Sequence, residues 1–170
     1  MIARERKNAM TKSSSETGIL IRRARRADVP RIASLIMQGA PHQTQTLAEI
    51  EVEAADPAYA EAFAEIEASP RDALFVAERD GTVVGTFQVT LIPGLAARGR
   101  RRAKFESVHV ARECRGHGIG EMMIRHALAF AQDNGAGIVE LSSNKSRKDA
   151  HRFYVRLGFA QSHEGFKLEL

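Results

Sequence analysis

The chain has 170 residues, 44% of them hydrophobic, and a formal net charge of +4, which suits one globular domain with a buried core. Its single cysteine, Cys114, excludes an internal disulfide and favours a reducing cytoplasm, and no apolar run approaches the ~20 residues of a membrane span. The mildly basic charge suits an anionic small ligand as well as a nucleic acid, so it does not choose between them.

The first predicted elements follow a polar N-terminal segment. Residues 1–17 are rich in Ser and Thr and lack both periodicity and an apolar signal core. We therefore expect a disordered arm without an export signal, and a single domain over residues 18–170. The apolar run at 18–24 predicts a strand, and helical spacing predicts one helix over 29–38 and another over 57–68.

The middle of the chain predicts a hairpin, further strands and a second pair of helices. Two β-rich runs over 73–92 flank an Asp-Gly pair, the strongest short signal for a hairpin turn. A Gly- and Arg-rich loop follows at 93–104, a strand at 105–110, and then a helix that an Asn-Gly pair ends. Residues 136–143 predict a buried strand and residues 147–158 the last helix.

The C-terminal segment, residues 159–170, predicts a turn between two short strands. The predicted order is β-α-α-β-β-β-α-β-α-β-β, without an internal repeat or a linker. This order indicates the α/β class, in the form of a mixed α+β sheet.

The stretch CRGHGIGE, residues 114–121, places three glycines where a helix is about to begin. A helix N-terminus leaves about four backbone N–H groups without partners and carries roughly half a positive charge. Glycine at 116, 118 and 120 removes side chains that block an anion and permits positive φ. Arg115 adds a fork of donors for phosphate oxygens, so the stretch predicts a pyrophosphate cradle.

The glycine spacing alone leaves the ligand open. The dinucleotide fingerprint has two residues between its last two glycines, and a P-loop ends in Lys-Ser or Lys-Thr; this stretch has neither. A flexible turn between strand and helix, without any ligand, accounts for the glycines equally well.

Two motifs resemble the GNAT superfamily of acetyl-CoA-dependent N-acetyltransferases. VHVARECRGHGIGEMMI resembles the central motif, in which a strand is followed by a glycine loop that begins a helix. NKSRKDAHRFYVRLGF resembles the second motif, an Asn at a strand end followed by a helix that ends in Gly-Phe. The residues that match are Arg115, Gly116, His117, Gly118, Ile119, Gly120, Asn144, Ala150, Phe153, Tyr154, Gly158 and Phe159. The resemblance covers about residues 18–170.

The resemblance implies a GNAT fold in which acetyl-CoA lies where two central parallel strands splay apart, here 105–110 and 136–142. Backbone groups of the first strand would pair with the pantetheine arm, and amides of the glycine loop would hold the pyrophosphate. Arg147 would reach the 3′-phosphate or the adenine side, although a solvated helix face also explains it. The implied cofactor-binding residues are Val108, His109, Val110, Arg115, Gly116, His117, Gly118, Ile119, Gly120, Asn144, Arg147 and Phe153.

The resemblance also implies a base for the acceptor amine. An alkyl amine with a pKa near 10.4 is only about one part in a thousand neutral at physiological pH, so a group must take its proton. Glu106 is the predicted base, against the alternative of a surface glutamate at a strand end. His109 has a suitable intrinsic pKa, but strand alternation places it on the opposite face unless a bulge intervenes.

The predicted acid is Tyr154, which would protonate the leaving coenzyme A thiolate. Its alternative is a core aromatic, because it shares an apolar helix face with Phe153 and Leu157. Cys114 precedes the glycine loop but is expected to be a small buried residue, since direct transfer needs no covalent acetyl-enzyme.

The acceptor is expected to be a small, anionic molecule with a primary amine. The Arg-rich loop 98–104 would meet an acidic group where acceptors enter, or else is simply solvated. The C-terminal segment resembles aminoalkylphosphonate N-acetyltransferases, with which it shares His151 and His163. No metal is expected, because the six histidines are scattered.

The resemblance suggests a homodimer by analogy alone. Two other functions stay open: an acetyl-CoA sensor that transfers nothing, and a basic module that associates with nucleic acid. The basic stretch lacks interleaved aromatic residues for base stacking, which argues against a nucleic-acid partner. No membrane partner is expected.

Overall fold

The computed structural model describes residues 18–170, so the expected disordered arm at 1–17 lies outside the described residues. The strands are β1 (Ile19–Arg23), β2 (Asp72–Arg79), β3 (Thr82–Ile92), β4 (Arg101–Val110) and β5 (Ala136–Leu141). The helices are α1 (Val29–Gln38), α2 (Leu47–Ala54), α3 (Pro57–Ala68), α4 (Ala96–Gly99), α5 (Ile119–Asp133) and α6 (Lys148–Arg156), with short 3₁₀ turns at Arg26–Asp28 and Arg112–Cys114.

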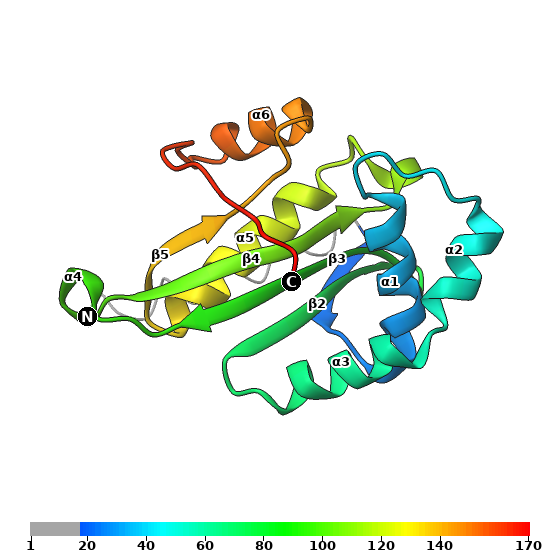
Figure 1. Ribbon diagram of the computed structural model, residues 1–170, viewed down its shortest axis with the longest axis horizontal. Coiled ribbons are helices and arrows are strands. Elements are labelled where there is room, and N and C mark those ends of the chain that lie inside the picture. The colour runs from blue at the N-terminus through cyan, green and yellow to red at the C-terminus, as the bar shows by residue number, and fades with distance from the viewer. Residues whose placement is uncertain (1–17) are drawn as a thin grey trace.

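The five strands form one mixed sheet in the order β1-β2-β3-β4-β5, in which every neighbouring pair is antiparallel except β4 with β5. Helices α1 and α3 cover one face of the sheet and α5 covers the other, while α6 stands beyond the end of β5 (Figure 1). The mixed sheet with helices on both faces confirms the predicted fold class.

The core includes buried residues of the sheet, of α1 and α3, and of α5, and an aromatic cluster lies between the sheet and α5. Phe75 of β2 and Phe87 of β3 stack with their ring centroids 5.0 Å apart, and Phe130 of α5 meets Phe75 edge-on at 5.3 Å. Phe87 is fully buried. Cross-strand aromatic pairs of this kind combine large buried areas with specific ring geometry.

Phe87→Ala is expected to lower the free energy of unfolding by about 3–5 kcal/mol, because it removes a buried ring and leaves a cavity. Urea unfolding followed by circular dichroism measures the loss. Phe166→Ala is the matched control, since Phe166 is 98% exposed, and it should leave the midpoint unchanged. Equal midpoints for the two variants would contradict this description of the core.

Helix α2 was not among the predicted elements, although its N-terminus carries a capping box. The Glu49 carboxylate accepts the backbone N–H of Thr46 at 2.7 Å, and the Thr46 hydroxyl accepts the backbone N–H of Glu49 at 3.3 Å. The Thr-x-x-Glu pattern was therefore a usable signal. The helix carries exposed apolar residues such as Val52, which blur its periodicity.

The predicted C-terminal strands are wrong. Residues 159–170 form no strand, so the sheet has five strands instead of seven. The alternating Phe166, Leu168 and Leu170 are 98%, 84% and 117% exposed. Alternation predicts a strand only where a buried face receives the apolar side chains, and here no such face does.

Strand β4 begins at Arg101, four residues earlier than predicted, because Arg101–Lys104 pair with β3, β5 or both.

Between residues 18 and 170, no helix is both long and apolar enough to span a bilayer. In the same residues, no three His, Cys, Asp or Glu side chains gather in a way that would hold a metal ion.

Candidate active site

The central feature of the site is the point at which β4 and β5 separate. The two parallel strands pair from Arg101 with Ala136 as far as Phe105 with Leu141. Strand β4 continues to Val110, and over residues 106–110 it keeps its pairing with β3 alone. We call this unpaired edge of β4, residues 106–110, the slot. It confirms the predicted splay of the central strands.

A β-bulge within the slot changes which side chains share a face. Glu106 lies opposite Gln88 and His109 opposite Thr86, so two residues of β4 face one residue of β3. Ser107 adopts positive φ at 51°, as a bulge of this kind requires. The extra residue brings Glu106 and His109 onto the same face of β4, which simple alternation would have prevented.

Glu106 lies at the solvent side of this face. Its carboxylate is 43% exposed and forms an ion pair of 2.8 Å with the Lys104 ammonium, two residues earlier on the same face. A half-exposed ion pair of this kind is worth little free energy, so an incoming ammonium group could replace Lys104.

His109 lies deeper, against the end of α1. Its Nδ1 atom is buried and has no hydrogen-bond partner. Burial, together with the positive charges of Arg147 and Arg115, lowers the pKa of His109 to about 4. The imidazole is therefore neutral at neutral pH.

The glycine loop forms an open cradle, which we define as residues 115–120. Helix α5 begins after Gly118, which is its N-cap with φ 78°, and no side chain caps this end of the helix. Gly116 also has positive φ, at 81°, and a Cβ atom at either glycine would meet nothing within 4 Å. The first amides of α5 are thus uncapped, and the backbone beside them is open to a ligand.

Gly120, the third glycine, lies beside Phe153 of α6. A Cβ atom there would lie 3.4 Å from the Phe153 ring, an ordinary van der Waals contact. The first turn of α5 is thus next to α6, which brings Phe153 of the second motif beside the cradle.

Arg115 links the cradle to the slot. Its Nε donates a hydrogen bond of 3.0 Å to the carbonyl oxygen of Val110, the last residue of β4. Val108 and Val110 are partly buried and pack against the core, while His117 is exposed between the two open glycines. The structure thus brings together the predicted residues of the strand end and the cradle.

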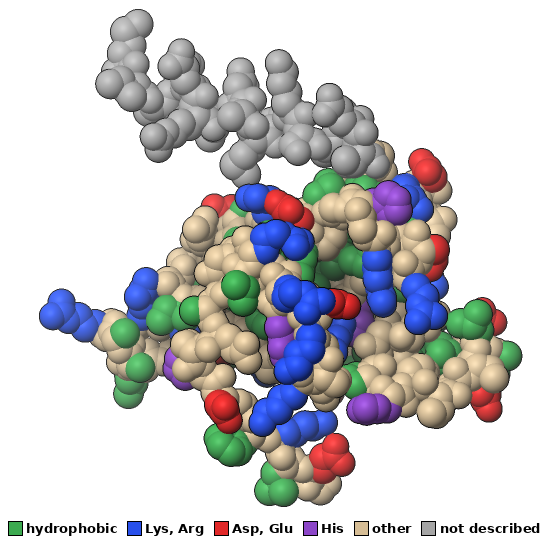
Figure 2. Space-filling view, turned by 90° about the horizontal axis from the view of Figure 1, so that it is seen from above, with side chains coloured by type: hydrophobic (Ala, Val, Ile, Leu, Met, Phe, Trp, Pro, Cys, Tyr) green, Lys and Arg blue, Asp and Glu red, His purple; other side chains and the backbone are tan. Residues whose placement is uncertain are grey.

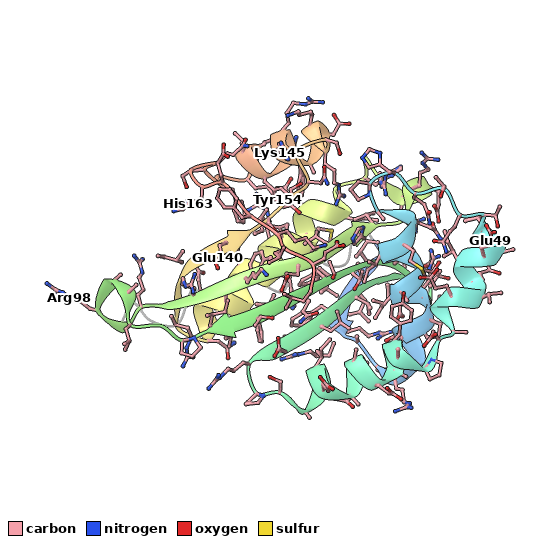
Figure 3. The ribbon with its side chains drawn as sticks, in the orientation of Figure 1. Glu49, Arg98, Glu140, Lys145, Tyr154 and His163 are labelled. Atoms are coloured by element: carbon pink, nitrogen blue, oxygen red, sulfur yellow. The ribbon has the colours of Figure 1, made fainter. Side chains whose placement is uncertain are left out.

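Tyr154 extends from α6 toward the sheet (Figure 3). Its ring lies 5.7 Å from Phe159, which in turn lies 6.5 Å from Phe105, the last β4 residue paired with β5. Burial raises the pKa of the Tyr154 hydroxyl, and the charge of Arg147 partly opposes this. Within residues 18–170 the hydroxyl makes no hydrogen bond, so it is free to donate one.

The turn before α6 carries the other predicted residues. The Asn144 side-chain oxygen accepts hydrogen bonds from the backbone N–H and the hydroxyl of Ser146 at 2.9 and 2.8 Å, which leaves its amide group as a donor. His151 donates from Nε2 to the Asn144 carbonyl oxygen at 2.9 Å. Because Arg147 influences the pKa of both His109 and Tyr154, its guanidinium lies near both.

The Arg-rich loop 98–104 does not border the slot at the cradle end. Arg98 stands at the far tip of the β3–β4 hairpin (Figure 3), about 30 Å along β4 from Val110 at the usual rise per residue. Arg102 pairs with Glu140 at 3.0 Å, and Arg101 donates to the Asn134 carbonyl oxygen at 2.7 Å. Residues 101–104 are therefore strand instead of the predicted loop, because they continue β4 and bind β5 and the end of α5.

A further group of basic side chains belongs to α6 and the turn before it. Figure 2 looks onto the side where α6 lies and shows Lys and Arg side chains gathered over the middle of that face. The basic residues of this segment are Lys145, Arg147, Lys148, Arg152 and Arg156.

Cys114 is 1% exposed and accepts a hydrogen bond from the Arg79 guanidinium at 3.1 Å. It is the buried residue that the sequence predicts and does not reach the slot.

The site residue that the sequence did not reveal is Gly39, the C-cap of α1, on which a Cβ atom would lie 2.0 Å from the His109 Nδ1 atom. In the sequence it signals only a helix end.

Comparison with known proteins agrees with this geometry. The model of the Acetyltransferase (GNAT) family matches residues 41–159. An aminoalkylphosphonate N-acetyltransferase of Salmonella typhimurium is 48% identical over 52 residues, which are 31% of this chain and 34% of that protein. The matched stretch is thus only about a third of that relative's length.

Solved structures match over nearly the whole described chain. A transcriptional regulator from Bacillus halodurans superposes with a TM-score of 0.81 and 31% identity, over 89% of this chain and 99% of that one. A putative acetyltransferase from Agrobacterium tumefaciens has a TM-score of 0.72 and 27% identity over the same shares. With the family model matched over residues 41–159, the chain therefore belongs to the GNAT family of acetyltransferases.

Proposed function

We propose that this enzyme moves the acetyl group of acetyl-CoA directly to the primary amine of a small, anionic acceptor. The observation that carries the proposal is the slot: a strand edge that loses its partner beside an uncapped helix N-terminus. An extended thiol arm can join such an edge by main-chain hydrogen bonds while its phosphates lie on the helix amides.

The residues of this region fit acetyl-CoA. Backbone groups of residues 108–110 would bind the pantetheine arm, amides of the cradle and Arg115 would bind the pyrophosphate, and the Asn144 amide would donate to the arm from the other side. Arg147 adds a positive charge for a phosphate. When bound, acetyl-CoA supplies an activated thioester carbonyl; the protein has to bring a neutral amine to it.

Glu106 is the proposed base that takes the proton from the acceptor ammonium. Support comes from its position on the open face of the slot and from the weak ion pair with Lys104 that an ammonium can replace. The Tyr154 hydroxyl is the proposed acid, which gives its proton to the thiolate that leaves. The raised pKa of Tyr154 keeps the hydroxyl protonated, and within residues 18–170 this hydroxyl has no hydrogen-bond partner.

Glu106→Gln is expected to lower kcat by at least about tenfold, because the amide cannot take a proton, although water can replace a half-exposed base in part. Steady-state release of coenzyme A measures it. Glu113→Gln is the matched control: that carboxylate is exposed in the turn before the cradle, and its loss should leave kcat unchanged. A kcat for Glu106→Gln equal to wild type would remove Glu106 from the mechanism.

The anionic acceptor is the finer part of the proposal. It rests on the basic side chains around α6 and on the activity for which the Salmonella relative is named, aminoalkylphosphonate N-acetylation. The test is coenzyme A release with aminoethylphosphonate, a glucosamine phosphate, glycine and spermidine. Turnover of spermidine but not of the anionic amines would contradict an anionic acceptor, since the arginines would repel a polycation.

A nucleic-acid role is the second candidate, because the similar protein from Bacillus halodurans is described as a transcriptional regulator. Salt-dependent binding of duplex DNA without acetyl-CoA affinity would favour it. Acetyl-CoA binding without turnover of any amine would favour a sensor.

We also propose that the enzyme is cytoplasmic, which its single cysteine suits. By analogy we propose a homodimer, for which light scattering at micromolar concentration is the test.

A further inference from the structure

The imidazole of His109 is in close contact with Gly39, and neither residue has a role in the proton transfers proposed above. It lies against Gly39, the C-cap residue of α1, where a Cβ atom would be 2.0 Å from Nδ1 and 2.6 Å from Cε1. Any side chain at residue 39 would therefore displace the ring. Gly39 has φ −91°, a value that other residues adopt freely, so the absent side chain rather than the backbone angle explains the glycine.

The two ring nitrogens of His109 have different surroundings. Nδ1 is buried against Gly39 without a hydrogen-bond partner, whereas Nε2 is not among the buried unpartnered atoms and makes no hydrogen bond within residues 18–170. Nε2 is therefore accessible. A polar side chain that is half-buried, with one nitrogen enclosed and the other free, is an unusual arrangement unless a ligand completes it.

The free nitrogen lies on the face where the acceptor amine is expected. The bulge at Ser107 brings His109 onto the same face as Glu106, and both belong to the unpaired stretch of β4. The ring lies against Gly39 of α1 and feels the positive charges of Arg115 and Arg147, and within residues 18–170 no group donates a hydrogen bond to Nε2.

We propose that His109 is the residue that positions the acceptor amine: its Nε2 accepts one N–H of the amine while Glu106 accepts another, and Gly39 holds the ring in place. The inference rests on the proposed function. An ammonium group offers only donors, so it selects the tautomer with the proton on Nδ1. Burial and the two arginines keep the ring uncharged, so it does not repel the incoming cation.

The two protons that the acceptor nitrogen loses go to groups other than His109. The ammonium loses one proton to Glu106, and the nitrogen that then forms the C–N bond keeps its orientation through the hydrogen bond to His109. As the C–S bond breaks, the thiolate takes a proton from Tyr154, and the second proton of the nitrogen passes through water to the Tyr154 phenolate and restores it, while Glu106 returns the first proton to solvent. His109 neither gains nor loses a proton, so it contributes to acceptor affinity and orientation and leaves acetyl-CoA affinity unchanged.

The test is a double-mutant cycle with Gly39→Ala and His109→Ala, assayed with the amine that turns over fastest among aminoethylphosphonate, a glucosamine phosphate and glycine. Each single variant should raise the acceptor KM about tenfold, the worth of one hydrogen bond to a charged group, with the acetyl-CoA Kd unchanged. In the His109→Ala background, Gly39→Ala should have no further effect, because the two act through one contact.

Two controls keep the result specific. Gly94→Ala introduces the same methyl group at a glycine with nothing within 4 Å and should change nothing. His109→Gln keeps an acceptor and should recover part of the lost affinity. Thermal melting verifies that each variant is folded, and His109→Ala, which only removes atoms, carries the test if Gly39→Ala is unstable.

A second readout does not depend on turnover. In ¹⁵N NMR of the imidazoles, adding the same amine to the enzyme with coenzyme A should shift the Nε2 signal of His109 and leave that of His126, which is partly buried beside Phe75, in place. An active wild type whose acceptor KM is unchanged in His109→Ala overturns this inference alone. A wild type that transfers acetyl to no amine overturns the proposed function, and this inference with it.

Discussion

Gly118→Glu is expected to abolish acetyl-CoA binding, with a loss of affinity above about a hundredfold. The new carboxylate would stand at the uncapped N-terminus of α5, where the proposed pyrophosphate site lies. A carboxylate is stabilised at this end of a helix, so it would bind the free amides itself. The cofactor would then lose about two charge-assisted hydrogen bonds and meet a like charge as well.

The main alternative explanation is backbone strain, because Gly118 has φ 78°. Gly135→Glu is the matched control, since Gly135 has φ 75° and open space around it but lies at the other end of α5. The two variants share the strain and differ only in the cradle. Calorimetric titration with acetyl-CoA compares them, and equal affinities for both would refute the cradle.

Tyr154→Phe is expected to lower kcat about a hundredfold, the lower range for loss of a general acid, and to change the acetyl-CoA Kd less than about twofold. The phenyl ring keeps the contacts with Phe153 and Phe159, at 5.2 and 5.7 Å, so the packing of α6 survives. Only the hydroxyl is lost, and with it the proton for the thiolate.

The control for this substitution is Tyr59→Phe, at the chain's second tyrosine. The Tyr59 hydroxyl of α3 contacts the Met37 sulfur at 3.9 Å, away from the slot, and its loss should leave kcat unchanged. Burial raises the pKa of Tyr154, so the wild-type acid stays protonated through neutral pH and up to the ordinary phenol value of about 10. A Tyr154→Phe enzyme with full kcat would make Tyr154 a packing residue.

The strand–glycine–helix unit was predictable because its signals are local. Gly116 and Gly118 stand where the backbone needs positive φ, and α5 begins directly after them. The second motif was recognised by its resemblance to the family, and helical spacing predicted only that Phe153 and Tyr154 share an apolar helix face. Helix α2 also had a local signal, the capping box of Thr46 and Glu49, and could have been found.

Other features depended on partners that are distant in the chain. The alternation in residues 159–170 predicted two strands, but these residues form no strand and pair with no strand of the sheet. The Arg-rich residues 101–104 were assigned to a loop, although pairing with β3 and β5 makes them strand. The residue types of these two segments do not decide whether they are strands. Hydrogen-bonding partners elsewhere in the chain decide whether each segment joins the sheet.

The sequence by itself determined the family, the order of the central elements and the cradle, because each is set by residues within one or two turns of one another. Only the tertiary structure decided which side chains share the slot. Glu106 and His109 lie on one face because β4 bulges against β3 at Ser107, and His109 has room because α1 ends in Gly39. Register between strands and contact between elements are properties of the folded chain, which no short stretch of sequence contains.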